Sequence, residues 1–343
     1  DDSVAAGYTP DVLPQFDTNN NGLVAQLTGD ETNVEITINT NATSNDPNLR
    51  QALDETSFLW GSLLKDPVEL LFDVVVGPLT GPIGVMNSTQ TFGQVEYDDV
   101  RDAMIADASD SERPLVERLP ELADLQTVGG TATGFINITR ANAKALGLDL
   151  DSITWNFPAT CFSVDCDGIF TISDGLPLDT FAPLTSLVLH EVGHALGFVS
   201  TLGRDLDDDD LSTLDMFRLE PGQGDVDFTN AQRVVAQGID AVFYDGKYDS
   251  TAHTAPAGLT VGDIPMSTGD PDPPGDGNQP SHFKSVLLGG VIIGVMDPTI
   301  QLSTIDPFQI MVSQFLKNLV HCILRLAESY SNTNSLDRYA LPL

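Results

Sequence analysis

The sequence is poor in positive charge. Lys and Arg together number 15 in a chain of 343 residues, against 50 Asp and Glu, and the formal net charge is −35. A surface with this charge repels nucleic acids and anionic membranes, so we expect neither as a partner. The same charge is compatible with an extracellular or high-salt setting and with bound calcium.

The sequence also lacks a long apolar run. The most apolar stretch near the C-terminus, residues 310–327, is interrupted by Gln, Lys, Asn, His and Arg side chains. A helix needs about 20 consecutive apolar residues to cross a bilayer, so no membrane span is predicted. We interpret residues 308–331 as an ordinary C-terminal helix, and the oligomeric state stays open. An apolar content of 41% is that of a globular protein.

Cysteine is scarce, with three in the chain. Cys161 and Cys166 flank a short loop and could close a disulfide, as a secreted protein would permit. A metal-binding pair is the alternative, but no other Cys or His lies near them in the sequence to complete a site. Cys322 is expected to be a buried thiol. The first residue is Asp1 rather than Met, so we expect a processed or trimmed form, and we expect the protein to be secreted.

What the sequence does contain is one helix with the residues of a zinc site. Apolar residues recur at helical spacing through residues 184–198, and His190 and His194 lie four residues apart, so both project from one face. Two imidazoles one turn apart form half of a tetrahedral zinc site. Glu191 follows the first ligand and lies beside the metal, where a general base takes a proton from water. Gly197 stands where helices commonly end in a left-handed turn.

The alternative for this helix is a pair of solvated or core histidines without a metal. The apolar surroundings disfavour it, because burying unpartnered histidines and a glutamate costs free energy. Gly197 also extends the pattern to H-E-x-x-H-x-x-G. A glycine there permits a sharp turn, which would let the chain supply a third ligand from downstream.

A catalytic zinc needs three protein ligands and an open position. The compact form of the motif would place a third histidine at residue 200, but Ser200 is a poor zinc ligand. Four candidates for the third ligand remain, namely Asp215, Glu220, His253 and His282. The two carboxylates suit an arrangement in which a second element supplies the ligand, and Asp215 is also a candidate for orienting a ligand histidine.

Three segments of the sequence resemble a known family. They are His-Glu-Val-Gly-His-Ala-Leu-Gly-Phe at 190–198, Ser-His-Phe at 281–283 and Val-Met-Asp-Pro at 295–298. Together they resemble the leishmanolysin-like branch of the metzincin zinc endopeptidases and its bacterial relatives, in which an inserted segment delays the third histidine. The resemblance implies that His190, His194 and His282 bind zinc and that Glu191 is the general base. It also implies that Met296 lies in a Met-turn and packs beneath the metal.

The rest of the chain predicts an α+β fold. Strands are predicted at 34–39, 68–76, 131–139, 153–157 and 168–172, and helices at 47–64, 95–108 and 140–146. We place a subdomain boundary after Gly197. Residues 1–197 would form an upper, mixed-sheet subdomain ending in the metal-binding helix. Residues 198–343 would form a loop-rich lower subdomain with the third ligand, the Met-turn and the C-terminal helix.

A second metal is suggested near the N-terminus. Residues 17–22, Asp-Thr-Asn-Asn-Asn-Gly, have oxygen-bearing side chains at alternate positions and a glycine at the sixth, as a calcium loop does. The twelfth position is Thr28, where such a loop has a bidentate glutamate. We therefore interpret the segment first as a turn, with a calcium site as the alternative.

These observations predict a secreted zinc endopeptidase that hydrolyses peptide bonds, with Glu191 taking a proton from the attacking water. The strand at 168–172 is expected to bind an extended substrate through its edge. The alternative function is an extracellular zinc- or calcium-stabilised binding or adhesion module without catalysis. A fourth protein ligand such as Asp215 would favour that alternative.

Overall fold

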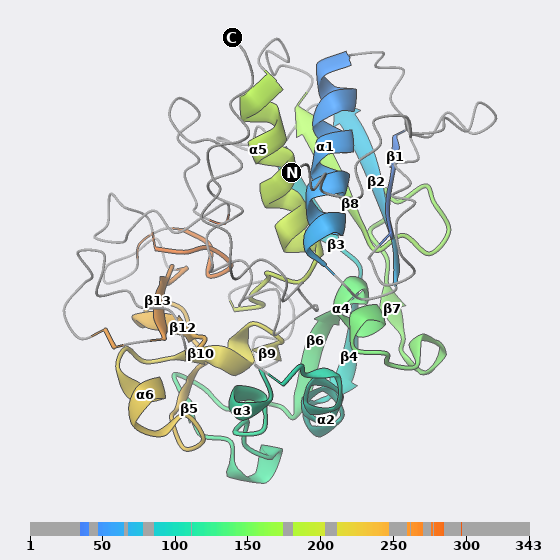
Figure 1. The fold of residues 1–343 in the computed structure, drawn as a ribbon. Coiled ribbons are helices and arrows are strands. Elements are labelled where there is room, and N and C mark those ends of the chain that lie inside the picture. Colours follow the sequence, from blue (N-terminus) through green and yellow to red (C-terminus); the bar gives the residue numbers. More distant parts are fainter. Residues whose placement is uncertain are drawn as a thin grey trace, which may run out of the picture.

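The structure is a computed structural model with helices and strands mixed along the chain (Figure 1). It describes residues 35–40, 47–64, 68–77, 86–110, 112–173, 181–202, 211–246, 259–260, 262–269, 276, 278–284 and 296. The predicted α+β class is confirmed. The calcium-like segment at 17–22, His253, Cys322 and the predicted C-terminal helix at 308–331 lie outside the described residues.

A mixed sheet with two helices against it forms the upper part of Figure 1. Its strand order is β1 (Glu35–Thr40), β2 (Glu69–Gly77), β8 (Gly168–Ser173) and β3 (Met86–Gln90). The first three strands are parallel, and β3 is antiparallel to β8. Helix α1 (Pro47–Leu63) connects β1 to β2 and packs beside α5 (Phe181–Ala195), as parallel strands require a crossover connection.

The position of β8 contradicts one prediction. This strand lies between β2 and β3 and forms backbone hydrogen bonds with both, so residues 168–172 have no free edge for a substrate. The edge strand next to β8 is β3, whose sequence Met-Asn-Ser-Thr-Gln carries no apolar alternation and was not predicted as a strand. Within the part of the chain that the structure describes, no other strand pairs with the outer edge of β3.

Two sheets of short strands form the lower part. One has the order β7 (Trp155–Asn156), β4 (Phe92–Glu96), β6 (Phe135–Thr139) and β9 (Leu211–Ser212). The other has the order β13 (Asp263–Met266), β12 (Ala241–Tyr244), β10 (Arg218–Leu219), β11 (Arg233–Val234) and β5 (Thr127–Val128). Strands from before and after residue 197 pair in both sheets, β6 with β9 and β5 with β11. Both lower sheets therefore contain strands from either side of the boundary predicted after Gly197.

Short helices complete the lower part. They are α2 (Tyr97–Asp107), α3 (Arg113–Val116), α4 (Arg140–Ala145) and α6 (Gln223–Asp227), with single 3-10 turns at Leu122–Asp124, Leu150–Ser152 and Asp215–Phe217. The helix predicted at 95–108 begins only at Tyr97, because Val95 pairs with Ile136 in the sheet. The strands predicted at 131–139 and 153–157 are shortened to Phe135–Thr139 and Trp155–Asn156. The described part contains no helix long and apolar enough to span a membrane.

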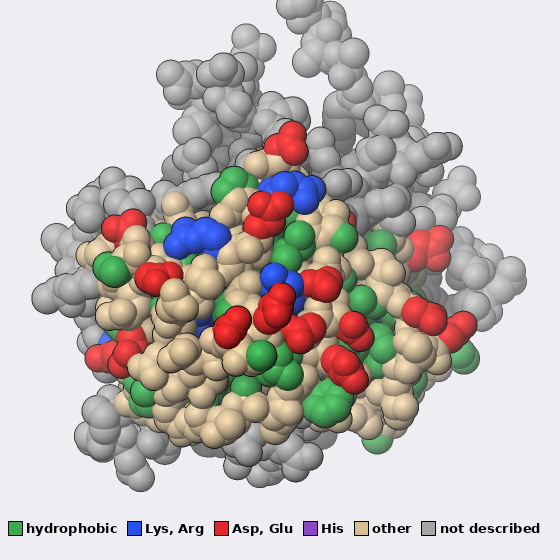
Figure 2. Space-filling view, turned by 90° about the horizontal axis from the view of Figure 1, so that it is seen from below, with side chains coloured by type: hydrophobic (Ala, Val, Ile, Leu, Met, Phe, Trp, Pro, Cys, Tyr) green, Lys and Arg blue, Asp and Glu red, His purple; other side chains and the backbone are tan. Residues whose placement is uncertain are grey.

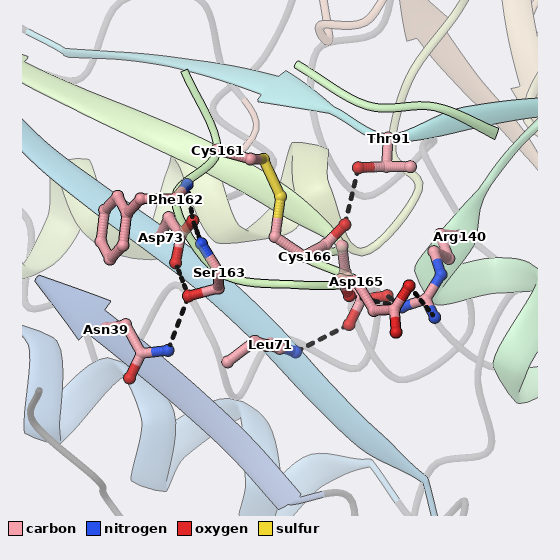
Figure 3. The surroundings of a disulfide bond; sticks show 11 residues. Asn39, Leu71, Asp73, Thr91, Arg140, Cys161, Phe162, Ser163, Asp165 and Cys166 are labelled. Carbon is pink, nitrogen blue, oxygen red and sulfur yellow. Dashed lines mark hydrogen bonds and ion pairs between the residues drawn. A yellow bond between two sulfur atoms is a disulfide. The ribbon is translucent and has the colours of Figure 1, made fainter. Parts of the chain in front are cut away.

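Of the two alternatives for Cys161 and Cys166, the structure has the disulfide (Figure 3). The loop that it closes lies over strand β2, where the carboxylate of Asp73 is fully buried. The backbone N–H groups of Phe162 and Ser163 donate to this carboxylate at 2.7 and 2.8 Å, and the Ser163 hydroxyl donates to its second oxygen. The disulfide loop therefore supplies the hydrogen-bond donors of a buried carboxylate. Since the two sulfurs are bonded to each other, the metal-binding alternative for the two cysteines is not needed.

Candidate metal centre

Helix α5 carries the first two candidate ligands. Its apolar residues Leu184, Val188, Val192 and Ala195 are buried, as the helical spacing predicts. His190, Glu191 and His194 are also buried, with 7%, 8% and 6% of their surfaces exposed. Trp60 of α1 donates its indole N–H to the carbonyl of Leu189 at 3.3 Å, which ties the ligand-bearing turn to the neighbouring helix.

Helix α5 ends in a left-handed turn at Gly197, as predicted. Gly197 has φ +113°, its N–H donates to the carbonyl of His194, and the N–H of Phe198 donates to that of Gly193. This pair of hydrogen bonds is a Schellman motif. A Cβ atom at position 197 would lie 2.1 Å from Oδ1 of Asn142, whose amide donates to the carbonyl of Leu196 at 2.6 Å. Glycine is required here both by the backbone conformation and by the close approach of Asn142.

The turn at Gly197 also orients a ligand. It directs the carbonyl of Phe198 toward His194, whose Nδ1 lies 2.7 Å from that oxygen. A carbonyl can only accept, so Nδ1 carries the proton and Nε2 of His194 is the nitrogen that would offer its lone pair to a metal. Nδ1 of His282 lies 3.3 Å from the carbonyl of Gln279, which favours the same tautomer. Ligand histidines commonly donate their second N–H to a carbonyl in this way.

Of the three candidates for the third ligand that the structure describes, Asp215, Glu220 and His282, it is His282 that lies beside His190 and His194. Its Nε2 lies 3.1 Å from Nε2 of His190 and 3.3 Å from Nε2 of His194, and the latter two nitrogens are 3.1 Å apart. In a tetrahedral site with Zn–N bonds of about 2.0–2.1 Å, the nitrogens are about 3.3 Å apart. The three imidazoles thus fit a metal ion. Lone pairs that converge this closely repel one another unless a cation lies among them.

The two carboxylate candidates, Asp215 and Glu220, do not join this group. Among the described residues, His282 is the one His, Cys, Asp or Glu that places a ligand atom in a group with those of His190 and His194. The carboxylate of Asp215, fully buried, accepts hydrogen bonds from the hydroxyls of Ser200 and Ser212, each at 2.7 Å, and from the backbone of both Thr201 and Ser212. Asp215 is therefore neither a ligand nor a direct partner of a ligand histidine.

Asp215 nevertheless contacts the site indirectly, through Ser200 and Ser281. It holds Ser200, whose N–H donates to the hydroxyl of Ser281 at 2.9 Å, and Ser281 immediately precedes His282. Through this chain of contacts the turn after α5 is joined to the segment that carries the third candidate ligand.

Glu191 lies beside the histidines and faces strand β3. Burial raises the pKa of its carboxyl to about 7, while hydrogen bonds from the side chain and backbone of Ser88 oppose the rise. Ser88 lies in the middle of β3 and pairs with Phe170 of β8. The candidate base is thus held next to the edge strand of the upper sheet.

Met296 packs under the helix between the two ligand-bearing turns. It is 1% exposed, and a Cβ atom on Gly193 would lie 2.5 Å from its sulfur. The N–H of Phe283 donates to the Met296 carbonyl at 3.1 Å, so this methionine contacts the helix and also the residue that follows His282.

Sequence reasoning did not identify Ser88 or Asn142, and it gave Ser281 no role of its own within the Ser-His-Phe segment. Each contacts the site through partners far away in the chain, since Asn142 and Leu196 are 54 positions apart and Ser200 and Ser281 are 81 positions apart. No local pattern marks Ser88 or Asn142.

Comparison with known protein families, with characterised proteins and with solved structures finds no match for this chain. The family resemblance therefore rests on the three short segments that carry it, and the functional conclusion rests on the geometry of the site.

Proposed function

We propose that this protein is a zinc-dependent endopeptidase. The observation that supports it is the convergence of three imidazole nitrogens, 3.1–3.3 Å apart, beside a buried glutamate on the same helix. Three protein ligands with an open fourth position are typical of catalytic zinc sites, whereas structural sites are closed by four protein ligands. The resemblance to leishmanolysin-like metzincins points to the same residues.

Zinc is the metal that suits this donor set. Calcium and magnesium require oxygen ligands, whereas neutral imidazoles suit zinc and its neighbours in the transition series. His190, His194 and His282 would hold the ion. When bound, zinc polarises a carbonyl group and lowers the pKa of a water at the open position.

Glu191 performs the proton transfers in this proposal. Its carboxylate accepts a proton from the attacking water and later passes it to the leaving amine, which a general base in this position can do in sequence. The side chain is 8% exposed, so bulk water has little access to it. The hydrogen bonds from Ser88 keep the carboxylate on the side of the helix that faces β3.

Strand β3 supplies the binding surface for an extended peptide. Its outer edge pairs with no other described strand, and an extended substrate can add to such an edge through backbone hydrogen bonds. Since Ser88 of β3 contacts Glu191, a peptide on this edge passes next to the general base. The disulfide supports a secreted protein, because disulfides persist in oxidising surroundings.

The decisive experiment compares Glu191→Gln with the wild-type protein after loading with zinc. We expect the variant to retain about one zinc per chain and to lose at least about 100-fold in peptide hydrolysis, as for the removal of a general base. Glu121→Gln, at an exposed position, is the control and should hydrolyse peptide like the wild type. Hydrolysis by Glu191→Gln at the wild-type rate, or hydrolysis that survives complete removal of metal, would reject the proposal.

A further inference from the structure

The third candidate ligand lies on a segment without regular structure of its own. His282 is held by backbone hydrogen bonds, in which its N–H donates to Gln279 at 3.1 Å and its carbonyl accepts from the N–H of Ser267 at 2.9 Å. Phe283 forms a bridge with Met266 at the end of β13. The location of the His282 ring therefore depends on how the segment 280–284 is registered against residues 265–267.

A buried side chain from a third segment, that of Arg218, donates hydrogen bonds to both of these segments. Arg218 belongs to β10, in the middle of the five-stranded sheet, and is 1% exposed. One end of its guanidinium donates to the carbonyl of Pro280 at 2.9 Å, and the other end donates to the carbonyl of Ser267 at 2.5 Å. Pro280 lies two residues before His282, and Ser267 is the residue that donates to the His282 carbonyl.

Arg218 is a costly residue to place there. None of the ion pairs among the described residues involves it, and Nε of its guanidinium has no hydrogen-bond partner. Burial lowers its pKa, an effect opposed through space by Asp215 and Asp276. A buried charge without a directly paired carboxylate is a burden on stability. An apolar side chain of similar length would fill the same space, so packing alone does not account for an arginine.

What an arginine provides is a rigid, planar group with donors at both ends. It can join two carbonyls at a set separation, which the single ammonium centre of a lysine cannot do. We propose that Arg218 is a positioning residue for the metal site. It sets the place of His282 by bridging Pro280 and Ser267, so that without it the site has two well-placed ligands in place of three. This inference rests on the metal site of the proposed function but not on its hydrolytic activity.

Arg233 offers a matched control. It is equally buried, lies in the neighbouring strand β11, and donates only to carbonyls, those of Met216, Phe228 and Ala231. None of these carbonyls belongs to the segments around His282. Replacing either arginine removes a buried guanidinium from the same sheet, and the Arg218 bridge is the one that contacts the ligand segment.

The experiment measures zinc affinity of the full chain by competition with a chelator of known affinity. We expect Arg218→Lys to weaken zinc binding by about 10- to 100-fold, as for other partners that orient a ligand, and Arg233→Lys to change it by less than about threefold. In a His282→Ala background the same Arg218→Lys change should have no further effect on affinity, since the ligand that it positions is gone. Arg218→Met, which removes the buried charge and keeps the length, serves as a second variant if Arg218→Lys does not fold.

Wild-type affinity in a folded Arg218 variant would overturn the inference. So would an equal loss of affinity in Arg233→Lys, or a loss that persists in the His282→Ala background, because either would indicate general loosening. A wild-type chain without zinc affinity would overturn both proposals. A chain that binds zinc but hydrolyses no peptide would overturn the proposed function only.

Discussion

At the scale of single residues, the conformation of Gly197 links the end of helix α5 to the orientation of a candidate metal ligand, His194. Only the left-handed turn brings the Phe198 carbonyl to 2.7 Å from Nδ1 of His194. Asn142 packs into the space where a side chain would lie, and its side-chain oxygen Oδ1 accepts from the hydroxyl of Thr213 at 2.9 Å. The tautomer of the ligand is thus set by a backbone turn that has no tolerance for a larger residue.

Gly197→Ala should therefore impair both stability and metal binding. The unfavourable backbone conformation costs about 1–3 kcal/mol, and displacement of Asn142 adds to that loss. Urea unfolding and zinc competition measure the two effects. Gly147→Ala is the control, because Gly147 also has a positive φ, +65°, yet nothing lies within 4 Å of its would-be Cβ.

We expect Gly147→Ala to lose about 1–2 kcal/mol and to bind zinc like the wild type. If the two alanine variants lost equal stability and both kept full zinc affinity, the turn at Gly197 would have no special role in the site.

At the scale of helices and strands, the sequence predicted those elements whose pattern is local. Helix α5, helix α1 and strand β2 were found because buried apolar residues recur within one segment. Strand β3 was not, because an edge strand of polar residues has no such pattern. Strands of two residues, such as β9 and β10, exist only through their pairing with distant segments.

The residues of the candidate site likewise divide into those that a local sequence pattern identifies and those that distant contacts position. His190, Glu191, His194 and Gly197 belong to one helix, whose spacing revealed them. His282 could be singled out only through the family resemblance, since its own segment has no regular structure and its position follows from pairing with β13. Arg218 could not be predicted at all, because its partners lie 49 and 62 residues away.

The disulfide loop shows how an irregular element can stabilise a strand. Asp73 is fully buried in β2, and its partners come from the loop, shown around it in Figure 3. Asn39 of β1 makes a neutral contact with the same loop, donating to the Ser163 hydroxyl at 3.0 Å. The loop thus contacts two neighbouring strands, but it satisfies a charge on only one of them.

Asp73→Asn should destabilise the protein by about 1.5–3 kcal/mol, since it removes charged hydrogen bonds and leaves a buried amide facing donors. Asn39→Ala, the neutral control in the same place, should cost about 0.5–1.5 kcal/mol. Reduction of the disulfide frees the loop and should cost about 2 kcal/mol by loop entropy. Urea unfolding with and without reductant measures all three. An Asp73→Asn variant as stable as the wild type would show that the loop does not serve the buried carboxylate.

At the scale of the whole molecule, charge is the dominant feature. Acidic side chains outnumber basic ones over the face seen in Figure 2. At most 15 of the 50 acidic groups can pair one-to-one with a Lys or Arg, so the repulsive pairs outweigh the attractive ones. Some attraction is sheltered from solvent, as in the pairs that Asp167 forms with Arg140 and Lys144 at 2.9 and 2.7 Å. Such buried pairs are screened less than exposed charges are.

Salt should therefore stabilise this protein. Repulsion among like charges opposes the compact state, and its range falls from about 30 Å at 0.01 M salt to about 10 Å at 0.1 M and about 3 Å at 1 M. We expect the midpoint of thermal unfolding to rise steadily between these concentrations, with NaCl and KCl giving equal curves because screening depends on ionic strength. A rise that instead requires millimolar calcium, and saturates there, would indicate a specific cation site. A midpoint that is unchanged by salt would mean that the acidic surface is too dispersed to oppose folding.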